Sequence, residues 1–257
     1  MKQRIITAAI LIAIFLPLVI IGGIPFLILT YIMATIGLYE LFAMRKLSIF
    51  SIKGFIALLM LWIFLIPNDF VNLEIKLELI SAGILLLLSY SVVVKNKFSF
   101  ADVGFLLISI FYVGIGFYYL VHTREAGLIY LLYALFVVWV TDSGAYFVGR
   151  KFGRKKLWPE ISPNKTVEGF VGGIISALIV AILFIIFTDL DIPFINLMLI
   201  TVVLSIFGQL GDLVESALKR HYGVKDSGNI FPGHGGILDR CDSWLFVLPL
   251  LSFFHVF

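Results

Sequence analysis

VEGFVGGIISALIVAILFIIF, residues 167–187, contains a single charged residue, Glu168. A helix needs about 20 mainly apolar residues to cross the hydrocarbon core of a bilayer. The stretch therefore predicts a membrane-spanning helix. Its first turns carry small residues three or four apart, a spacing that lets helix backbones approach closely: Gly169, Gly172, Gly173 and Ser176.

The whole chain has the same apolar character. Hydrophobic residues make up 61% of its 257 residues and charged residues only 14%, whereas soluble domains contain about 25% charged residues. The composition predicts an integral membrane protein. The single cysteine, Cys241, excludes an intramolecular disulfide and a cysteine-based zinc site.

Apolar runs separated by charges, Gly and Pro predict the following spans: 5–21, 25–43, 54–67, 77–94, 101–121, 126–148, 167–187, 194–214 and 243–257. We therefore expect an all-α, polytopic protein with about nine transmembrane helices, in a single transmembrane domain over residues 1–257. No small-residue cleavage site closes the first run, so we expect it to be retained and not removed as a signal peptide.

The basic residues indicate the direction of the chain. With the N-terminus in the cytoplasm, the cytoplasmic segments are 1–4, 44–53, 95–100, 149–166 and 215–242. These segments and the adjoining span ends hold 17 of the 19 Lys and Arg residues, and only Lys76 and Arg124 fall outside. Because basic loops stay on the cytoplasmic side, this split places the C-terminus outside and the chain in the inner (cytoplasmic) membrane of the cell. It also accounts for the net charge of +3, so we expect no nucleic-acid partner.

Some carboxylates fall within or beside the apolar spans. Asp142 lies in FVVWVTDSGAYFVGRKFG, and a carboxylate in hydrocarbon is a functional-site hypothesis by default; the alternative is a hydrogen bond to a neighbouring helix. Asp212, Glu215, Ser216 and Lys219 follow an i, i+3, i+4, i+7 spacing, which places them on one helical face.

Asp239 and Asp242 are three residues apart where the last span begins, so they are also expected to share a face. Helices from both ends of the 215–242 loop would then bring Asp212, Asp239 and Asp242 to one depth. This predicts a Mg²⁺ site, with room for a second metal ion, because Mg²⁺ prefers oxygen ligands together with substrate phosphates. The alternative is that these acids face water.

The same loop offers groups suited to phosphate. The basic candidates are Lys219, Arg220, Lys225 and Arg240, with Lys165 from the preceding loop. Gly235 and Gly236 allow backbone amides to turn toward an anion. His234 is a candidate for phosphate contact or proton transfer, and a structural hydrogen bond is the alternative.

The stretch ISPNKTVEG, residues 161–169, forms a second polar segment. We expect Pro163 to fix a turn, Thr166 to cap the following helix, and Glu168 to benefit from its dipole. Hydroxyl, amide and ammonium groups beside a helix N-terminus suit anionic or nucleotide groups: Ser162, Asn164 and Lys165.

SALKRHYGVKDSGNIFPGHGGILDRCD, residues 216–242, resembles the signature of the CDP-diacylglycerol synthases, or phosphatidate cytidylyltransferases. That pattern reads S-x-apolar-K-R-x4-K-D-x-small-x2-apolar-P-x-H-G-G-apolar-x-D-R-apolar-D. DSGAYFVGRKFG at 142–153 and ISPNKTVEG resemble the upstream blocks of the family, so the detailed resemblance covers 142–242, where we expect the active-site region. Cys241 departs from the pattern, because it stands at an apolar position.

The resemblance implies that a cytidylyl group passes from CTP to phosphatidic acid, giving CDP-diacylglycerol and pyrophosphate in phospholipid biosynthesis. It implies a Mg-dependent nucleotidyltransferase at the cytoplasmic face of the bilayer, with a homodimer as one option for its assembly. The implied metal ligands are Asp212, Asp239 and Asp242. The implied catalytic residues are these three with Lys219, Arg220, Lys225, Arg240 and His234. The implied substrate-binding residues are Ser162, Asn164, Lys165, Thr166, Glu168, Ser216, Asp142, Gly235 and Gly236.

Three other functions are compared with this one. A CTP-dependent lipid kinase would release CDP in place of pyrophosphate. The D-G-x2-A-R-x8-G-x3-D-x3-D pattern of CDP-alcohol phosphotransferases is absent. A transporter should carry polar groups near the bilayer midplane on interrupted helices, whereas the polar groups here cluster toward one face.

Overall fold

The computed structural model describes residues 2–188, 190 and 192–256 and is mainly helical. Its elements are α1 (Lys2–Ile21), α2 (Gly23–Met44), α3 (Ile52–Leu65), α4 (Leu73–Val93), α5 (Phe100–Ala126), α6 (Leu128–Phe152), β1 (Lys156–Trp158), β2 (Ser162–Thr166), α7 (Val167–Phe187), α8 (Phe194–His221) and α9 (Leu238–Phe253). Each predicted span overlaps one of these helices. Within the described residues, six helices are long and apolar enough to cross a membrane: α2, α4, α5, α6, α7 and α8. The fold is therefore that of an integral membrane protein, while nine spans and the direction of the chain stay predictions.

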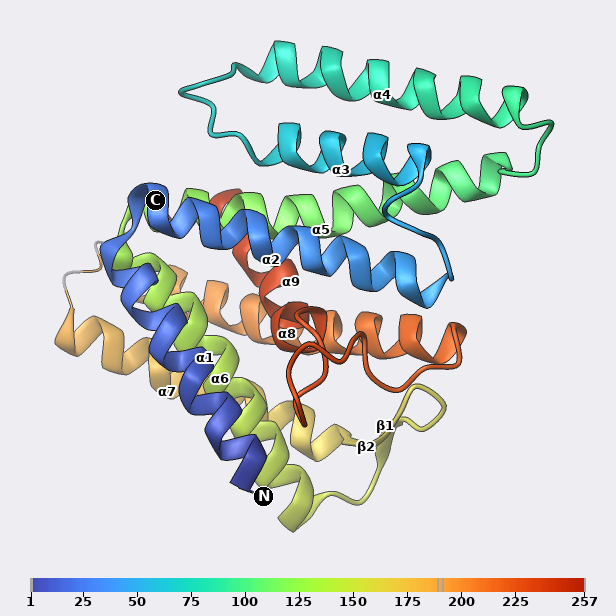
Figure 1. Cartoon of the computed structure of the whole chain (residues 1–257). Helices are drawn as coiled ribbons and strands as arrows, with labels where there is room; N and C mark the ends of the chain where they lie inside the picture. Colours follow the sequence, from blue (N-terminus) through green and yellow to red (C-terminus); the bar gives the residue numbers. More distant parts are fainter. Residues whose placement is uncertain (1, 189, 191, 257) are drawn as a thin grey trace.

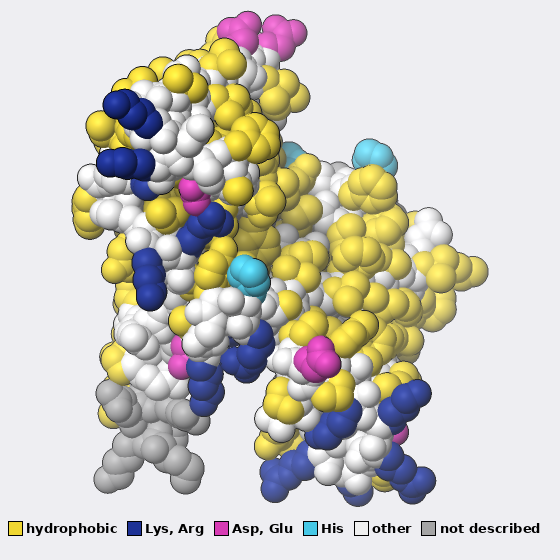
Figure 2. Space-filling view, turned by 90° about the vertical axis from the view of Figure 1, so that its right-hand side faces the viewer, with side chains coloured by type: hydrophobic (Ala, Val, Ile, Leu, Met, Phe, Trp, Pro, Cys, Tyr) yellow, Lys and Arg dark blue, Asp and Glu magenta, His cyan; other side chains and the backbone are white. Residues whose placement is uncertain are grey.

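The connections between helices fall on two sides of the molecule. In Figure 1 the links from α2 to α3, from α4 to α5 and from α8 to α9 lie on the right, with the β1–β2 hairpin below them. The links from α1 to α2, from α3 to α4 and from α7 to α8 lie on the left, together with the C-terminus. The segments predicted to be cytoplasmic between helices thus share one side. Figure 2 shows that side, with Lys and Arg side chains on both edges of a notch.

α6 and α8 continue beyond their predicted ends. α6 extends to Phe152 and α8 to His221, although the apolar runs end at 148 and 214. Both added segments carry basic residues in the last turn, where cations are favoured by the helix dipole. Asp142 and the Asp212–Lys219 face therefore lie on regular helix.

The 149–166 segment is not the plain loop of an all-α protein. β1 and β2 form an antiparallel hairpin in which Lys156 pairs with Thr166 and Trp158 with Ser162. The expectation that Pro163 fixes a turn is wrong, because Pro163 lies within β2. A two-stranded hairpin consists of edge strands, and there the missing N–H of proline is tolerated.

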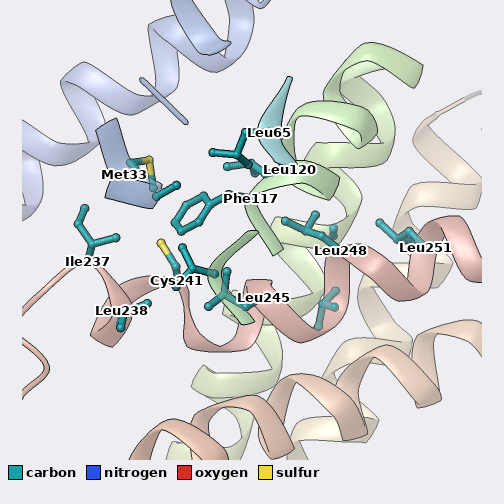
Figure 3. Close-up of a cluster of buried hydrophobic side chains, with 14 of the residues drawn as sticks. Met33, Leu65, Phe117, Leu120, Ile237, Leu238, Cys241, Leu245, Leu248 and Leu251 are labelled. Carbon is teal, nitrogen blue, oxygen red and sulfur yellow. The ribbon is translucent and has the colours of Figure 1, made fainter. Parts of the chain in front are cut away.

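α9 runs through the centre of the helical packing. Figure 3 shows Cys241, Leu245 and Leu248 of α9 beside Phe117 of α5. A Cβ placed on Gly116 would lie 2.7 Å from the Cα of Leu245, so α5 and α9 touch backbone to backbone. Cys241 is 1% exposed and packs as an apolar side chain, as its place in the pattern requires.

α6 and α7 also pack closely. A Cβ on Gly144 would collide with the side chain of Ser176, and a Cβ on Gly172 would lie 2.5 Å from the Cβ of Val148. The predicted close approach at the small residues of α7 is confirmed. This contact fixes α6, and with it Asp142, against the rest of the site.

Candidate active site

The 216–242 segment begins on the last turns of α8 and ends in the first turns of α9. Between the helices, the loop is closed by backbone hydrogen bonds: His234 N–H donates to Phe231 O at 2.8 Å and Phe231 N–H to Gly235 O at 2.9 Å. Arg240 Nε donates to His234 O at 2.9 Å, which ties α9 to the loop. Gly235 has a φ of 78°, a conformation that glycine adopts readily.

Asp239 accepts hydrogen bonds on both carboxylate oxygens. Its Oδ2 accepts from Ser227 N–H, Ser227 Oγ and Gly236 N–H, each at 2.8 Å. Its Oδ1 lies 2.6 Å from Lys219 Nζ. Burial alone would raise the pKa of Asp239, but the Gly236 amide and the Lys219 ammonium stabilise the carboxylate and hold its pKa below its ordinary value. Asp239 is therefore an anchoring anion for the loop.

Lys219 lies between two carboxylates. It contacts Asp239 across the helix junction and forms an i, i+4 ion pair with Glu215 on α8. Glu215 is fully buried, and Lys219 is the cation that pairs with it. The predicted face of α8 is confirmed here, and Ser216 Oγ also donates to Asp212 Oδ1 at 3.3 Å. Lys219 thus links the last turns of α8 to the first turn of α9.

Glu40 of α2 also belongs to this junction, although sequence reasoning missed it. Its carboxylate accepts hydrogen bonds from Ile237 N–H at 2.8 Å, Leu238 N–H at 3.0 Å and Ser227 Oγ at 2.8 Å. The sequence held a signal for it. Glu40 is an acid inside an apolar span, and the free-energy cost of placing a carboxylate in hydrocarbon indicates a functional site.

Asp142, Asp212 and Asp242 form an acidic group that is separate from the junction of Lys219 and Asp239. Electrostatic interactions connect all three carboxylates, which come from α6, α8 and α9. Lys165 of β2 is the cation beside them, with its Nζ 2.7 Å from Asp212 Oδ2. The structure thus brings Asp212 and Asp242 together as predicted and adds Asp142, whereas Asp239 is engaged by Lys219 and Ser227.

Within the described part of the chain, no set of three or more His, Cys, Asp or Glu side chains is arranged as a ready-made metal site. The chemistry of the donors nevertheless fits a hard cation, because three carboxylates share one neighbouring lysine at Asp212. The trio of Asp212, Asp239 and Asp242 as metal ligands stays a prediction.

Some residues of the hairpin and of the start of α7 hold the backbone in place, and others are candidates for substrate contact. Thr166 Oγ accepts a hydrogen bond from Gly169 N–H at 3.1 Å, so its predicted capping role is confirmed. Glu168 accepts from the backbone amides of Arg154 and Lys155, which holds the start of the hairpin against α7. The predicted substrate-binding residues Ser162, Asn164 and Lys165 lie on β2, and Lys165 contacts Asp212 of the acidic group.

A polar pocket of about 440 Å³ opens beside the loop that the Phe231–Gly235 hydrogen bond closes. It is lined by Lys225, Asp226, Asn229, Phe231, Pro232, Gly233, His234, Gly235 and Arg240. His234 Nδ1 is buried and has no hydrogen-bond partner. Arg220 lies outside this lining and donates to Val224 O at 3.3 Å. The pocket offers the two cations Lys225 and Arg240 to an anion.

A model described as the cytidylyltransferase family matches residues 2–257. A protein of Bacillus subtilis (strain 168) named phosphatidate cytidylyltransferase is 56% identical over 260 residues, which cover 98% of this chain and 97% of that protein. A protein of the same name from Staphylococcus saprophyticus is 54% identical over 255 residues, covering 98% of each chain. Another from Staphylococcus aureus (strain COL) is 49% identical with the same coverage.

Proposed function

Because the chain belongs to the cytidylyltransferase family, we propose that it acts as a phosphatidate cytidylyltransferase. It transfers a cytidylyl group from CTP to phosphatidic acid and produces CDP-diacylglycerol and pyrophosphate. The observation that carries the proposal is the near full-length match to relatives of that name. Residues 142–242 contribute most of the site, and the whole chain forms one transmembrane domain.

The reaction joins a phosphate oxygen of phosphatidate to the α-phosphorus of CTP and breaks the bond from that phosphorus to the β-phosphate. The attacking oxygen is already anionic, so the protein needs no strong general base. Catalysis then depends on positioning two polyanions and neutralising their charge. The cations of the pocket and Lys165 supply positive charge, and the acidic group would add to it by holding a metal ion.

The cations divide between the two substrates. Lys225, Arg240 and His234 line the polar pocket, where they bind phosphate oxygens of the nucleotide. Lys165, beside the acidic group, orients the phosphate that reacts. Lys219 holds Asp239 in place and contributes positive charge near the reacting groups.

The acidic group of Asp142, Asp212 and Asp242 would hold Mg²⁺, a second metal ion remaining an option. When bound, Mg²⁺ neutralises phosphate charge and makes the α-phosphorus more electrophilic. The role of the three carboxylates is to keep this charge beside the pocket. Asp239 is placed at the junction that supports them.

The geometry suits a reaction between a dissolved and a membrane-bound substrate. The hairpin and the link from α8 to α9 lie on one side of the molecule (Figure 1), and basic side chains gather on that side (Figure 2). We place that side in the cytoplasm, at the inner membrane of the cell, because basic loops are retained there. CTP would enter from water, and phosphatidic acid from the adjoining leaflet.

The proposal is tested by incubating purified protein with phosphatidate, Mg²⁺ and each of the four nucleoside triphosphates. The expected products are CDP-diacylglycerol and pyrophosphate, identified by mass spectrometry and formed with CTP. Release of CDP with a phosphorylated lipid would indicate a kinase and contradict the proposal. Ligand flux in sealed vesicles without chemical conversion would indicate a transporter.

A further inference from the structure

Glu40 lies on α2 and accepts a hydrogen bond from Ile237 N–H at the start of α9. The two residues are 197 positions apart in the sequence. Glu40 is 2% exposed. Burial of an unpaired carboxylate is costly, and Glu40 meets this cost with three hydrogen bonds, two from backbone amides and one from a hydroxyl. All three donors belong to the 216–242 segment.

Two of these donors are the free amides at the start of α9. Ile237 and Leu238 occupy the N-cap and the first helical position, where N–H groups have no partner within the helix. The carboxylate of Glu40 satisfies both and lies at the positive end of the helix dipole. Glu40 therefore fixes the point at which α9 begins, one residue before Asp239.

The third donor connects Glu40 to Asp239. Ser227 Oγ lies 2.8 Å from Glu40 Oε2 and 2.8 Å from Asp239 Oδ2. Since a hydroxyl carries one proton, it donates to one carboxylate at a time while touching both. Asp239 in turn holds Lys219 at 2.6 Å. A continuous chain of contacts runs from Glu40 through Ser227 and Asp239 to Lys219.

The loop is shaped around the Glu40 carboxylate. A Cβ on Gly236 would collide with Glu40 Oε1, and a Cβ on Gly228 would lie 2.7 Å from the same oxygen. Two glycines of the segment thus leave the space that the carboxylate fills. This accommodation supports a role for Glu40 that is specific to the loop geometry.

We propose that Glu40 is a positioning residue of the active site, which sets the Asp239 carboxylate and Lys219 through Ser227 and the first amides of α9. The inference rests on the proposed cytidylyltransferase activity. Glu40 itself does not touch the substrates. Its loss should lower the turnover of bound substrates more than it weakens their binding.

The test compares Glu40→Gln with the wild type in phosphatidate and CTP kinetics. Glutamine keeps the size of the side chain but replaces one acceptor oxygen by a donor. Either the Ile237 amide, or the Leu238 amide together with Ser227 Oγ, then loses its acceptor. Hydrogen bonds to charged groups contribute enough that kcat should fall about ten- to hundredfold. KM for both substrates should change by less than about threefold, because the groups that bind the substrates in the ground state are unchanged.

Asp102→Asn is the matched control. Asp102 is also a carboxylate that caps a helix, because it accepts hydrogen bonds from Ser99 N–H and Oγ at 2.8 Å at the start of α5. Its hydrogen bonds with Ser99 and its ion pair with Arg45 do not involve the 216–242 segment. This variant should lose thermal stability while keeping kcat.

Ser227→Ala provides a second test that does not depend on the folding of the Glu40 variant. It removes only the hydroxyl between the two carboxylates, and kcat should fall with KM unchanged. In the double variant the losses in kcat should be less than multiplicative, because both changes break the same chain. Glu40→Asp, which keeps the charge, should recover part of the activity that Glu40→Gln loses.

Wild-type kcat in Ser227→Ala, or an equal loss of kcat in Asp102→Asn and Glu40→Gln, would overturn the positioning role. If the wild-type protein itself formed no CDP-diacylglycerol, the proposed function would fail first, so the two failures are distinguishable.

Discussion

Lys165 of β2 and Asp212 of α8 form an ion pair with 2.7 Å between Nζ and Oδ2. The contact joins the hairpin segment to the helix from which the 216–242 segment begins. Two stretches that are about 50 residues apart in sequence therefore meet at one acidic group. Both side chains stay partly exposed, so a phosphate can reach the ammonium group.

Replacement of Lys165 by Gln should lower kcat/KM for CTP about ten- to hundredfold, since a charge that stabilises the reacting phosphate is lost. Thermal stability should change little, because a partly exposed ion pair contributes at most about 1 kcal/mol. Lys156→Gln removes an equal charge from the exposed strand β1 of the same hairpin and serves as the control. Equal turnover in the two variants would remove Lys165 from the site.

Asp239→Asn should reduce CDP-diacylglycerol formation at least about a hundredfold, because the new amide cannot accept all the hydrogen bonds that Asp239 receives. Lys219 would also lose the carboxylate that orients it. Size-exclusion chromatography in detergent shows whether the variant stays folded. Near-normal turnover in a folded sample would exclude Asp239 from the mechanism.

Chelation of divalent ions should abolish activity, and Mg²⁺ should restore it, because the role proposed for the acidic group is to hold a hard cation. Asp212→Asn should raise the Mg²⁺ concentration needed for half-maximal rate. Glu160→Gln, an exposed acid between the two hairpin strands, should leave that concentration unchanged. Full turnover in the presence of a chelator would contradict the metal proposal.

Gly236→Ala should lower thermal stability strongly, because the new methyl group would collide with Glu40 and Ser227 at a buried position. Gly104→Ala on α5 is the control, since no atom lies within 4 Å of its added Cβ. Alanine there should stabilise the helix by about 1 kcal/mol. Denaturation followed by tryptophan fluorescence measures both changes, and equal stability of the two variants would argue against the packing described around Glu40.

Much of the helical framework was predictable, because an apolar run long enough to span a bilayer satisfies its own backbone hydrogen bonds as an α-helix. The hairpin was not, because β1 and β2 have only three and five residues and no alternating pattern. Local rules worked where contacts are local: the Thr166 cap and the i, i+4 pair of Glu215 and Lys219 both follow from spacing.

Spacing did not distinguish the surroundings of Asp239 from those of Asp242. Both lie on α9, three residues apart, but α9 begins at Leu238, so Asp239 lies in the first turn. There, the amides of the preceding loop and Lys219 reach it, whereas Asp242 interacts with Asp212 and Asp142. Glu40 was missed because its partners lie far along the chain, where no periodicity connects them.

CTP labelled with ³²P at either the α or the γ position distinguishes transfer of a cytidylyl group to a phosphatidate oxygen from transfer of a terminal phosphate. The α label should appear in the lipid product and the γ label in pyrophosphate. A γ label in the lipid, with the α label left in soluble CDP, would contradict cytidylyl transfer.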